Sequence, residues 1–164
     1  MRTMNRTKKG IVLLIAALAL ALALCACGGS SGKDVPVADI VTAVDGVLGG
    51  GENLAEADAG LVEGYMKLSP DDYSDFAVKI NSYGTSFDEY GVFQATDSSQ
   101  AKTIAKALEA YLQLKLETDM GYQPEELPKL EKAEVKTSGN YVMYCILGDT
   151  EKSAAFGAFE DALK

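Results

Sequence analysis

The sequence predicts an α+β domain in which helices pack on an antiparallel β-sheet, with the element order αββαββα. Apolar residues recur at helical spacing in three separate segments, and two pairs of strand-like runs lie between those segments. Turn-forming residues join the strands of each pair, as in antiparallel hairpins. We expect one domain over residues 36–164, because a chain of this length can bury a single hydrophobic core.

The first helix is predicted over residues 37–48, where apolar side chains lie three and four positions apart between a proline and a run of glycines. In the segment that follows this helix, the apolar residues recur at neither helical nor strand spacing. We expect a loop there, with a short turn or strand around residues 61–68. Ser69–Tyr73, which reads Ser-Pro-Asp-Asp-Tyr, predicts one capped helical turn.

The middle of the domain is predicted to contain a strand pair followed by a long helix. Phe76–Ile80 alternates as a strand does, and Glu89–Ala95 is rich in aromatic and β-branched residues. Asp97 and Gln100 have the spacing of a capping box, so the helix should begin there and end at Gly121. Its apolar face consists of Ile104, Ala105, Leu108, Leu112 and Leu116.

A second hairpin and a last helix are predicted to complete the fold. Gly139 and Asn140 separate two strand-like runs, and we expect both residues to adopt positive φ angles in a two-residue turn. The final helix should be capped by Asp149 or Thr150. Its predicted buried side chains are Phe156, Phe159 and Leu163.

Residues 1–26 are predicted to be a lipoprotein signal peptide. Four basic residues precede an apolar run over residues 11–24, which is shorter than the roughly 20 residues of a membrane-spanning helix. The end of this run resembles the cleavage site of bacterial lipoproteins, in which a small residue precedes the lipidated cysteine and Leu lies three positions before it. Leu24 and Ala26 hold these positions relative to Cys27, whereas the bulky Leu24 directly precedes Cys25. We therefore expect Cys27 to carry the lipid.

Lipidation at Cys27 would hold the protein on the extracytoplasmic face of the cell membrane. Each buried methylene of an acyl chain contributes about 0.8 kcal/mol, so several chains together form a lasting anchor. Residues 27–35 are rich in Gly and Ser, which predicts a flexible tether between the lipid and the domain.

Composition excludes several classes of function. Four of the 15 basic residues and none of the 24 acidic residues precede Cys27, which leaves a net charge of −13 on the mature chain and argues against a nucleic-acid partner. The chain has no histidine, the commonest general base and metal ligand. We expect no catalytic residue, no metal and no cofactor. Cys145 lies in an apolar run, which predicts a buried and unreactive thiol.

Three short motifs carry a family resemblance. They are Y-x-x-S-F-D-E-Y-x-V-F over residues 83–93, GYQPEEL over 121–127 and GNYVMYCIL over 139–147. In this order, and after a lipoprotein signal, they resemble a family of small bacterial lipoproteins, domain-of-unknown-function family 4358. The resemblance extends from Ile40 to Phe159. It implies the location and the fold but no reaction.

The candidate binding residues are Asp88, Glu89, Tyr90 and Tyr122. Asp88 and Glu89 are adjacent acids at the start of a strand in a Gly- and Ser-rich loop, where they are suited to a cation, a peptide amine or a sugar. Alternation along a strand points neighbouring side chains to opposite faces, so this pair is a poor candidate for two carboxylates that act on one substrate. Tyr122 and Pro124 are expected to pack in the loop after the long helix and stiffen it.

These observations favour a non-enzymatic binding or interaction module, with an envelope protein, a peptide or a small molecule as its partner. Such a module should expose an aromatic patch, for which Tyr65, Tyr83, Phe87 and Tyr90 are the candidates. One alternative is an accessory subunit of a cell-envelope complex. Another is a hydrolase that depends on carboxylates or on a Ser-Lys pair, which would require a pocket where those groups converge.

Overall fold

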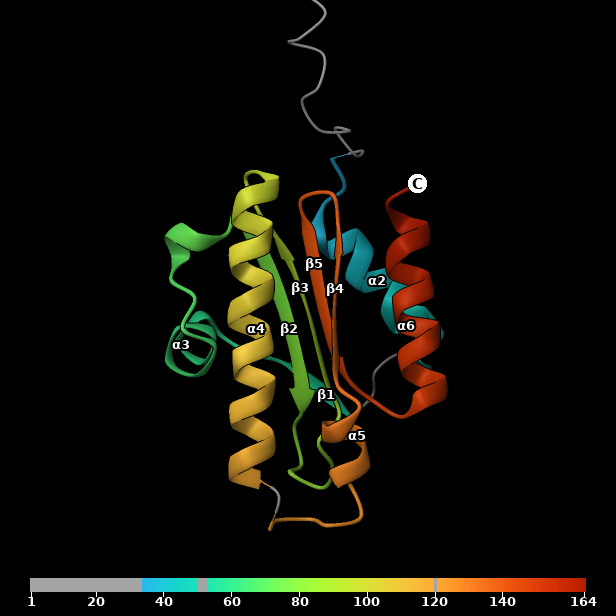
Figure 1. Cartoon of the computed structure of the whole chain (residues 1–164). Helices are drawn as coiled ribbons and strands as arrows, with labels where there is room; N and C mark the ends of the chain where they lie inside the picture. The colour runs from blue at the N-terminus through green and yellow to red at the C-terminus, as the bar shows by residue number, and fades with distance from the viewer. Residues whose placement is uncertain (1–33, 50–52, 120) are drawn as a thin grey trace, which may run out of the picture. The chain divides into compact units, whose positions relative to one another are not determined.

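A computed structural model of the protein describes residues 34–49, 53–119 and 121–164. Within these ranges, five antiparallel strands form one sheet in the order β1-β2-β3-β5-β4, with helices on both of its faces (Figure 1). The predicted α+β class and antiparallel sheet are confirmed. The predicted signal peptide and Cys27 lie outside the described residues. No helix among the described residues is long and apolar enough to cross a membrane.

The sheet is built around two central strands that are covered on both faces. Its strands are β1 Leu54–Glu56, β2 Asp75–Asn81, β3 Glu89–Gln94, β4 Glu134–Ser138 and β5 Tyr141–Ile146. Tyr90 lies opposite Lys79 of β2 and Cys145 of β5, and Gly91 lies opposite Val78 and Tyr144. Both predicted strand pairs are confirmed. The short edge strand β1, which pairs with the end of β2, was not predicted.

The helical elements are α2 Val37–Val47, α3 Ala59–Leu61, η2 Val62–Met66, η3 Pro70–Asp72, α4 Ser98–Asp119, α5 Leu127–Glu131 and α6 Asp149–Ala162. The predicted order αββαββα therefore lacks β1 and α5, whereas the α3–η2 turn is the first of the two alternatives expected around residues 61–68. Residues 61–68 are mostly helical rather than a strand. Val62 and Met66 lie one turn apart and are both buried, and Lys67 ends the turn with a φ of 58°.

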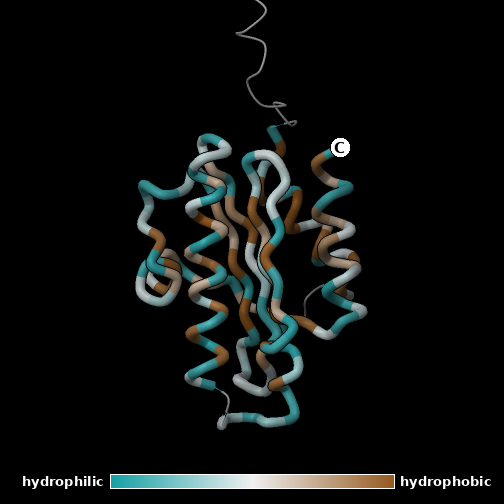
Figure 2. Tube along the Cα trace, in the orientation of Figure 1, coloured by the Kyte–Doolittle hydropathy of each residue, from teal (hydrophilic) through white to brown (hydrophobic). Residues whose placement is uncertain are grey.

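One face of the sheet packs against α4, η2 and α5. Ile104 and Leu108 of α4 are buried against Phe93, Val142 and Tyr144 of the central strands. Figure 2 shows the hydrophobic colouring concentrated on those strands, while α4 alternates between the two colours. This alternation is the amphipathic pattern that the sequence predicts for the long helix.

The other face is covered by α2 and α6, which contact each other. Tyr90 and Cys145 point into this layer and are fully buried. The predicted burial of the Cys145 thiol is confirmed, and this burial raises its pKa far above the ordinary value. The hydroxyl of Tyr90 donates to Asp45 of α2 at 2.6 Å, and Lys79 of β2 forms an ion pair with the same carboxylate. These contacts fasten α2 to the sheet.

Two local predictions require correction. Gly139 has a φ of 59°, but Asn140 does not adopt a positive φ, so glycine alone supplies the special conformation at the β4–β5 turn. The cap of α6 is Gly148, and Asp149 is the first helical residue, where its charge favours the positive end of the helix dipole. Phe156 and Phe159 are buried as predicted, whereas Leu163 is only partly buried.

Candidate functional site

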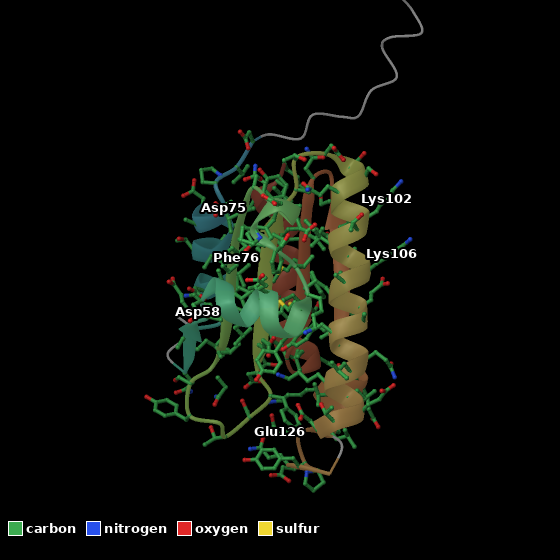
Figure 3. The ribbon with its side chains drawn as sticks, turned by 90° about the vertical axis from the view of Figure 1, so that its left-hand side faces the viewer. Asp58, Asp75, Phe76, Lys102, Lys106 and Glu126 are labelled. Carbon is green, nitrogen blue, oxygen red and sulfur yellow. The ribbon has the colours of Figure 1, made fainter. Side chains whose placement is uncertain are left out.

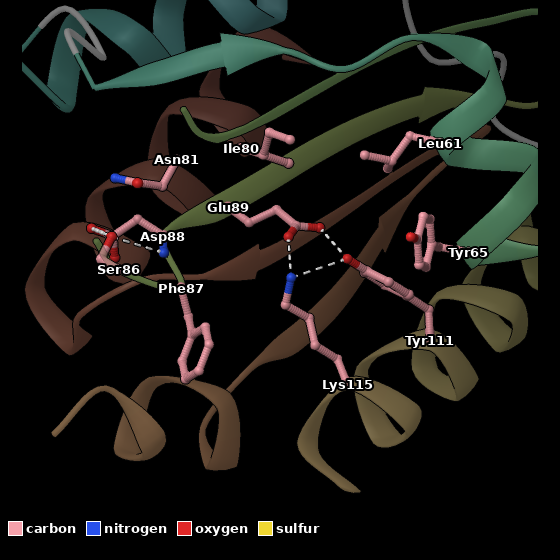
Figure 4. Close-up of a pocket in the computed structure, with 10 residues that line it drawn as sticks. All are labelled: Leu61, Tyr65, Ile80, Asn81, Ser86, Phe87, Asp88, Glu89, Tyr111 and Lys115. Atoms are coloured by element: carbon pink, nitrogen blue, oxygen red, sulfur yellow. Dashed lines mark hydrogen bonds and ion pairs between the residues drawn. The ribbon is translucent and has the colours of Figure 1, made fainter. Parts of the chain in front are cut away.

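A pocket of about 250 Å³ opens on the α4 side of the sheet, where β2 ends and β3 begins. Its polar lining consists of Asn81, Ser86, Asp88, Glu89, Tyr111 and Lys115 (Figure 4). Its apolar lining comes from Leu61, Ile80 and Phe87. Tyr65 of η2 also lines the pocket and is 65% exposed, which places an aromatic ring at the boundary with solvent.

Glu89 is the central charged group of this pocket. The residue is only 2% exposed, and both of its carboxylate oxygens accept hydrogen bonds within the protein. Oε1 accepts hydrogen bonds from the hydroxyls of Tyr111 at 2.7 Å and Tyr144 at 2.6 Å. Oε2 accepts one from Nζ of Lys115 at 2.8 Å. A buried carboxylate is tolerated when it is paired and hydrogen-bonded in this way.

The sheet register brings Tyr144 to Glu89. Glu89 and Gly91 lie two positions apart on β3, so both face the α4 side. Tyr144 of β5 is paired with Gly91, and a Cβ atom at Gly91 would lie 2.5 Å from Cε1 of Tyr144. The missing side chain at Gly91 therefore leaves room for the ring of Tyr144, whose hydroxyl reaches Glu89.

Helix α4 supplies the other two partners. Tyr111 and Lys115 are four positions apart and therefore lie one above the other on the helix face. Nζ of Lys115 is 5.7 Å from the centre of the Tyr111 ring and 3.4 Å from its hydroxyl. The side chain of Lys115 is 21% exposed, so its ammonium group reaches both the buried carboxylate and the pocket.

The surroundings of Tyr111 and Tyr144 keep the hydroxyls of both residues protonated. Burial, followed by the negative charge of Glu89 and the hydrogen bond to it, raises the pKa of Tyr111 far above its ordinary value. Burial and the charge of Glu89 raise the pKa of Tyr144 in the same direction. At neutral pH these hydroxyls are therefore donors to Glu89 and not proton acceptors.

Asp88 engages a different lysine from its neighbour. Its Oδ1 accepts from Nζ of Lys129 at 2.7 Å, and its Oδ2 accepts from the hydroxyl of Ser86 at 2.9 Å. Lys129 also forms an ion pair with Glu126 at 2.7 Å. Burial lowers the pKa of Lys129, but the hydrogen bonds and charges of the two acids outweigh that effect and raise it. Asp88 and Glu89 thus line one pocket while their charges are compensated separately.

The other two candidate residues lie away from this pocket. Tyr90 points to the opposite face of the sheet, as alternation after Glu89 requires. Tyr122 is 64% exposed and does not pack in its loop as expected. The expected aromatic patch is not formed, because Phe87 and Tyr90 are buried and only Tyr65 and Tyr83 are exposed.

Sequence reasoning missed Tyr111, Lys115, Lys129 and Tyr144. One signal was present for Lys115, which continues the buried stripe of α4 one turn after Tyr111, where an apolar residue is expected. By contrast, Lys102 and Lys106 are exposed and point away from the sheet (Figure 3). A lysine on the core side of an amphipathic helix predicts a buried acidic partner.

Comparison with known proteins places the chain in a family. Residues 50–147, more than half of the chain, match the model described as Domain of unknown function (DUF4358). The chain belongs to the DUF4358 family. The predicted family is confirmed over a shorter range than expected, and the match does not include the predicted signal peptide or Cys27. No curated protein and no solved structure matches the chain.

The DUF4358 match contains the complete sheet and the complete pocket. All five strands fall within residues 50–147, as do Glu89 and its three partners. Helices α2 and α6, which cover the other face, lie outside the match. The described part of this DUF4358 protein holds no group of three or more side chains arranged to ligate a metal ion.

Proposed function

We propose that this protein is a non-enzymatic binding module, held on the extracytoplasmic face of the cell membrane by lipid at Cys27, and that the Glu89 pocket is its ligand site. One observation carries the proposal. A buried carboxylate is fixed by three donors in an open pocket, and one of those donors, Lys115, remains partly exposed. Such preorganised polar groups are typical of small-molecule sites.

The hydrogen bonds of the pocket favour binding over hydrolysis. A carboxylate- or Ser-Lys-dependent hydrolase needs a nucleophile and an available base. The hydroxyl of Ser86 donates to Asp88 and accepts from the backbone N–H of the same residue, which is a local turn arrangement. Tyr111 and Tyr144 remain protonated, and Lys115 is hydrogen-bonded to Glu89. These contacts orient the polar groups, and they engage Ser86 and Lys115 with carboxylates rather than with each other.

Blocking the pocket tests the ligand site. Leu61 lines the pocket and is half-buried, so Leu61→Trp should fill part of the space while it keeps an apolar side chain there. We expect compounds from a ligand-observed NMR screen to bind the natural chain and to lose binding in this variant. A screen without binders, or binders that the variant retains, would overturn the assignment of the pocket.

Replacing the lipidated cysteine tests the membrane anchor. Cys27→Ala removes the thiol that would carry the acyl chains, so the protein should move from the membrane fraction to the soluble fraction. Cys25→Ala is the matched control, because this cysteine is expected to leave with the signal peptide, and its variant should remain in the membrane fraction. Membrane retention of the Cys27→Ala protein in cell fractionation would contradict the proposed anchor.

A further inference from the structure

The acceptors of the Glu89 pocket are already engaged by the protein. Each carboxylate oxygen of Asp88 and Glu89 accepts at least one hydrogen bond. Oδ1 of Asn81 accepts from the backbone N–H groups of Tyr83 and Thr85, each at 3.1 Å. An incoming ligand therefore meets no bare carboxylate.

This arrangement disfavours a charged ligand of either sign. A cation or a peptide amine would have to share Asp88 or Glu89 with the lysine that already neutralises it. An anion would approach a group of three acids, Asp88, Glu89 and Glu126, that is balanced by only those two lysines. Of the three ligand classes suited to adjacent acids, the neutral sugar has no such conflict.

The hydrogen-bond donors and acceptors that remain unused in the pocket suit a ligand that carries hydroxyl groups. The ammonium of Lys115 has three hydrogens and two oxygen neighbours, Glu89 and Tyr111. No hydrogen bond among the described residues uses Nδ2 of Asn81. Asp88 and Glu89 keep lone pairs, because a carboxylate offers about four acceptor sites. A hydroxyl both donates and accepts, so it can use the donors and the acceptors that remain.

Tyr65 adds an aromatic surface to this polar lining. Its side chain is 65% exposed and belongs to the pocket, and its ring lies beside Tyr111 and Leu61 in Figure 4. An exposed aromatic ring next to hydrogen-bonding groups suits a ligand with an apolar face and polar edges. A pyranose ring has this character. The volume of about 250 Å³ lies below the usual range of drug-sized pockets, which fits one ring rather than a long chain.

We propose that the Glu89 pocket binds a neutral saccharide unit, which stacks on Tyr65 and forms hydroxyl hydrogen bonds with Lys115 and Asp88. This inference rests on the proposed function, because it names the ligand class of that same site. It places the ligand within residues 50–147, the range that the family model matches, and not at the helices α2 and α6 on the other face.

The test is a titration of the full chain in a polyoxyethylene detergent, which carries no sugar headgroup. The probes are glucose and N-acetylglucosamine as neutral sugars, acetate as an anion and cadaverine as a cation, with binding followed by protein-observed NMR. Tyr65→Ala should weaken sugar binding about tenfold or more, which corresponds to the loss of about 1.4 kcal/mol. Tyr83→Ala is the matched control, because Tyr83 is 70% exposed and does not line the pocket.

The outcomes separate this inference from the proposed function. Sugar binding that Tyr65→Ala weakens and Tyr83→Ala leaves unchanged supports the inference. If acetate or cadaverine binds, the sugars do not, and Leu61→Trp removes the binding, the saccharide inference fails while the pocket remains a binding site. An equal loss in both tyrosine variants also overturns the inference. If no compound of any class binds, the proposed function fails as well.

Discussion

Gly91 controls the position of Tyr144 and therefore the support of Glu89. The ring of Tyr144 crosses β3 at Gly91, where Cγ2 of Val78 also lies 2.8 Å from the position that a Cβ atom would take. Neither neighbour is a flexible chain end that can move at little cost, since both side chains are buried in the core. A single hydrogen atom at Gly91 is thus required by packing rather than by a backbone angle.

Gly91→Ala should destabilise the domain by about 1–3 kcal/mol, the usual cost of inserting a methyl group into a packed core. Urea unfolding measures this change. Gly46→Ala in α2 is the control, because a Cβ atom there meets nothing within 4 Å. The control should be stabilised by up to about 1 kcal/mol through helix propensity. Equal stability of Gly91→Ala and the natural chain would contradict the assigned role of Gly91.

At the scale of elements, α4 positions two of the three partners of Glu89. The helix begins with a side-chain cap, in which Oδ1 of Asp97 accepts from the backbone N–H groups of Ser99 at 2.8 Å and Gln100 at 2.9 Å. The side chain of Gln100 accepts from the backbone N–H of Thr96 at 2.8 Å. The predicted start of α4 is therefore confirmed, and its cap lies at the end of the helix remote from Lys115.

Asp97→Ala should lower the free energy of unfolding by about 1 kcal/mol, because two N–H groups lose their acceptor. Glu109→Ala is the control, since Glu109 is exposed in the middle of the same helix, and its effect should stay within about 0.5 kcal/mol. Denaturant unfolding of both variants gives the comparison. An Asp97→Ala protein as stable as the control would show that this cap contributes nothing to α4.

At the scale of the whole molecule, three buried tyrosines link stability to alkaline pH. Burial is the largest cause that raises the pKa of Tyr90, Tyr111 and Tyr144, with a neighbouring carboxylate acting in the same direction. In the unfolded chain a tyrosine releases its proton near pH 10. Above that pH the unfolded state holds fewer protons than the native state, so the free energy of unfolding must fall as the pH rises.

The loss of stability between about pH 9 and pH 11 should be smaller in Tyr144→Phe than in the natural chain. The variant lacks one of the three hydroxyl protons that the native state retains and the unfolded state releases in this range. Urea unfolding at each pH measures the slope. The comparison between the two proteins cancels the titration of lysines, which they share. Identical slopes would mean that Tyr144 titrates equally in the folded and unfolded states.

Local patterns in the sequence determined most of the elements. The spacing of apolar residues predicts α2 and α4, alternation predicts β2, and aromatic and β-branched residues predict β3. Gly139 predicts the turn between β4 and β5. These signals are readable because each depends on residues that are close together in the chain. The same short motifs indicated the DUF4358 family, which the match over residues 50–147 establishes.

Only the tertiary structure decided what surrounds Glu89. Its partners Tyr111, Lys115 and Tyr144 lie 22, 26 and 55 positions further along the chain. They meet it because α4 packs on the sheet and because β5 pairs with β3 in one register. A shift of that register by one residue would turn Tyr144 to the opposite face of the sheet. Adjacent acids are visible in the sequence, but their compensation by separate lysines depends on packing between distant segments.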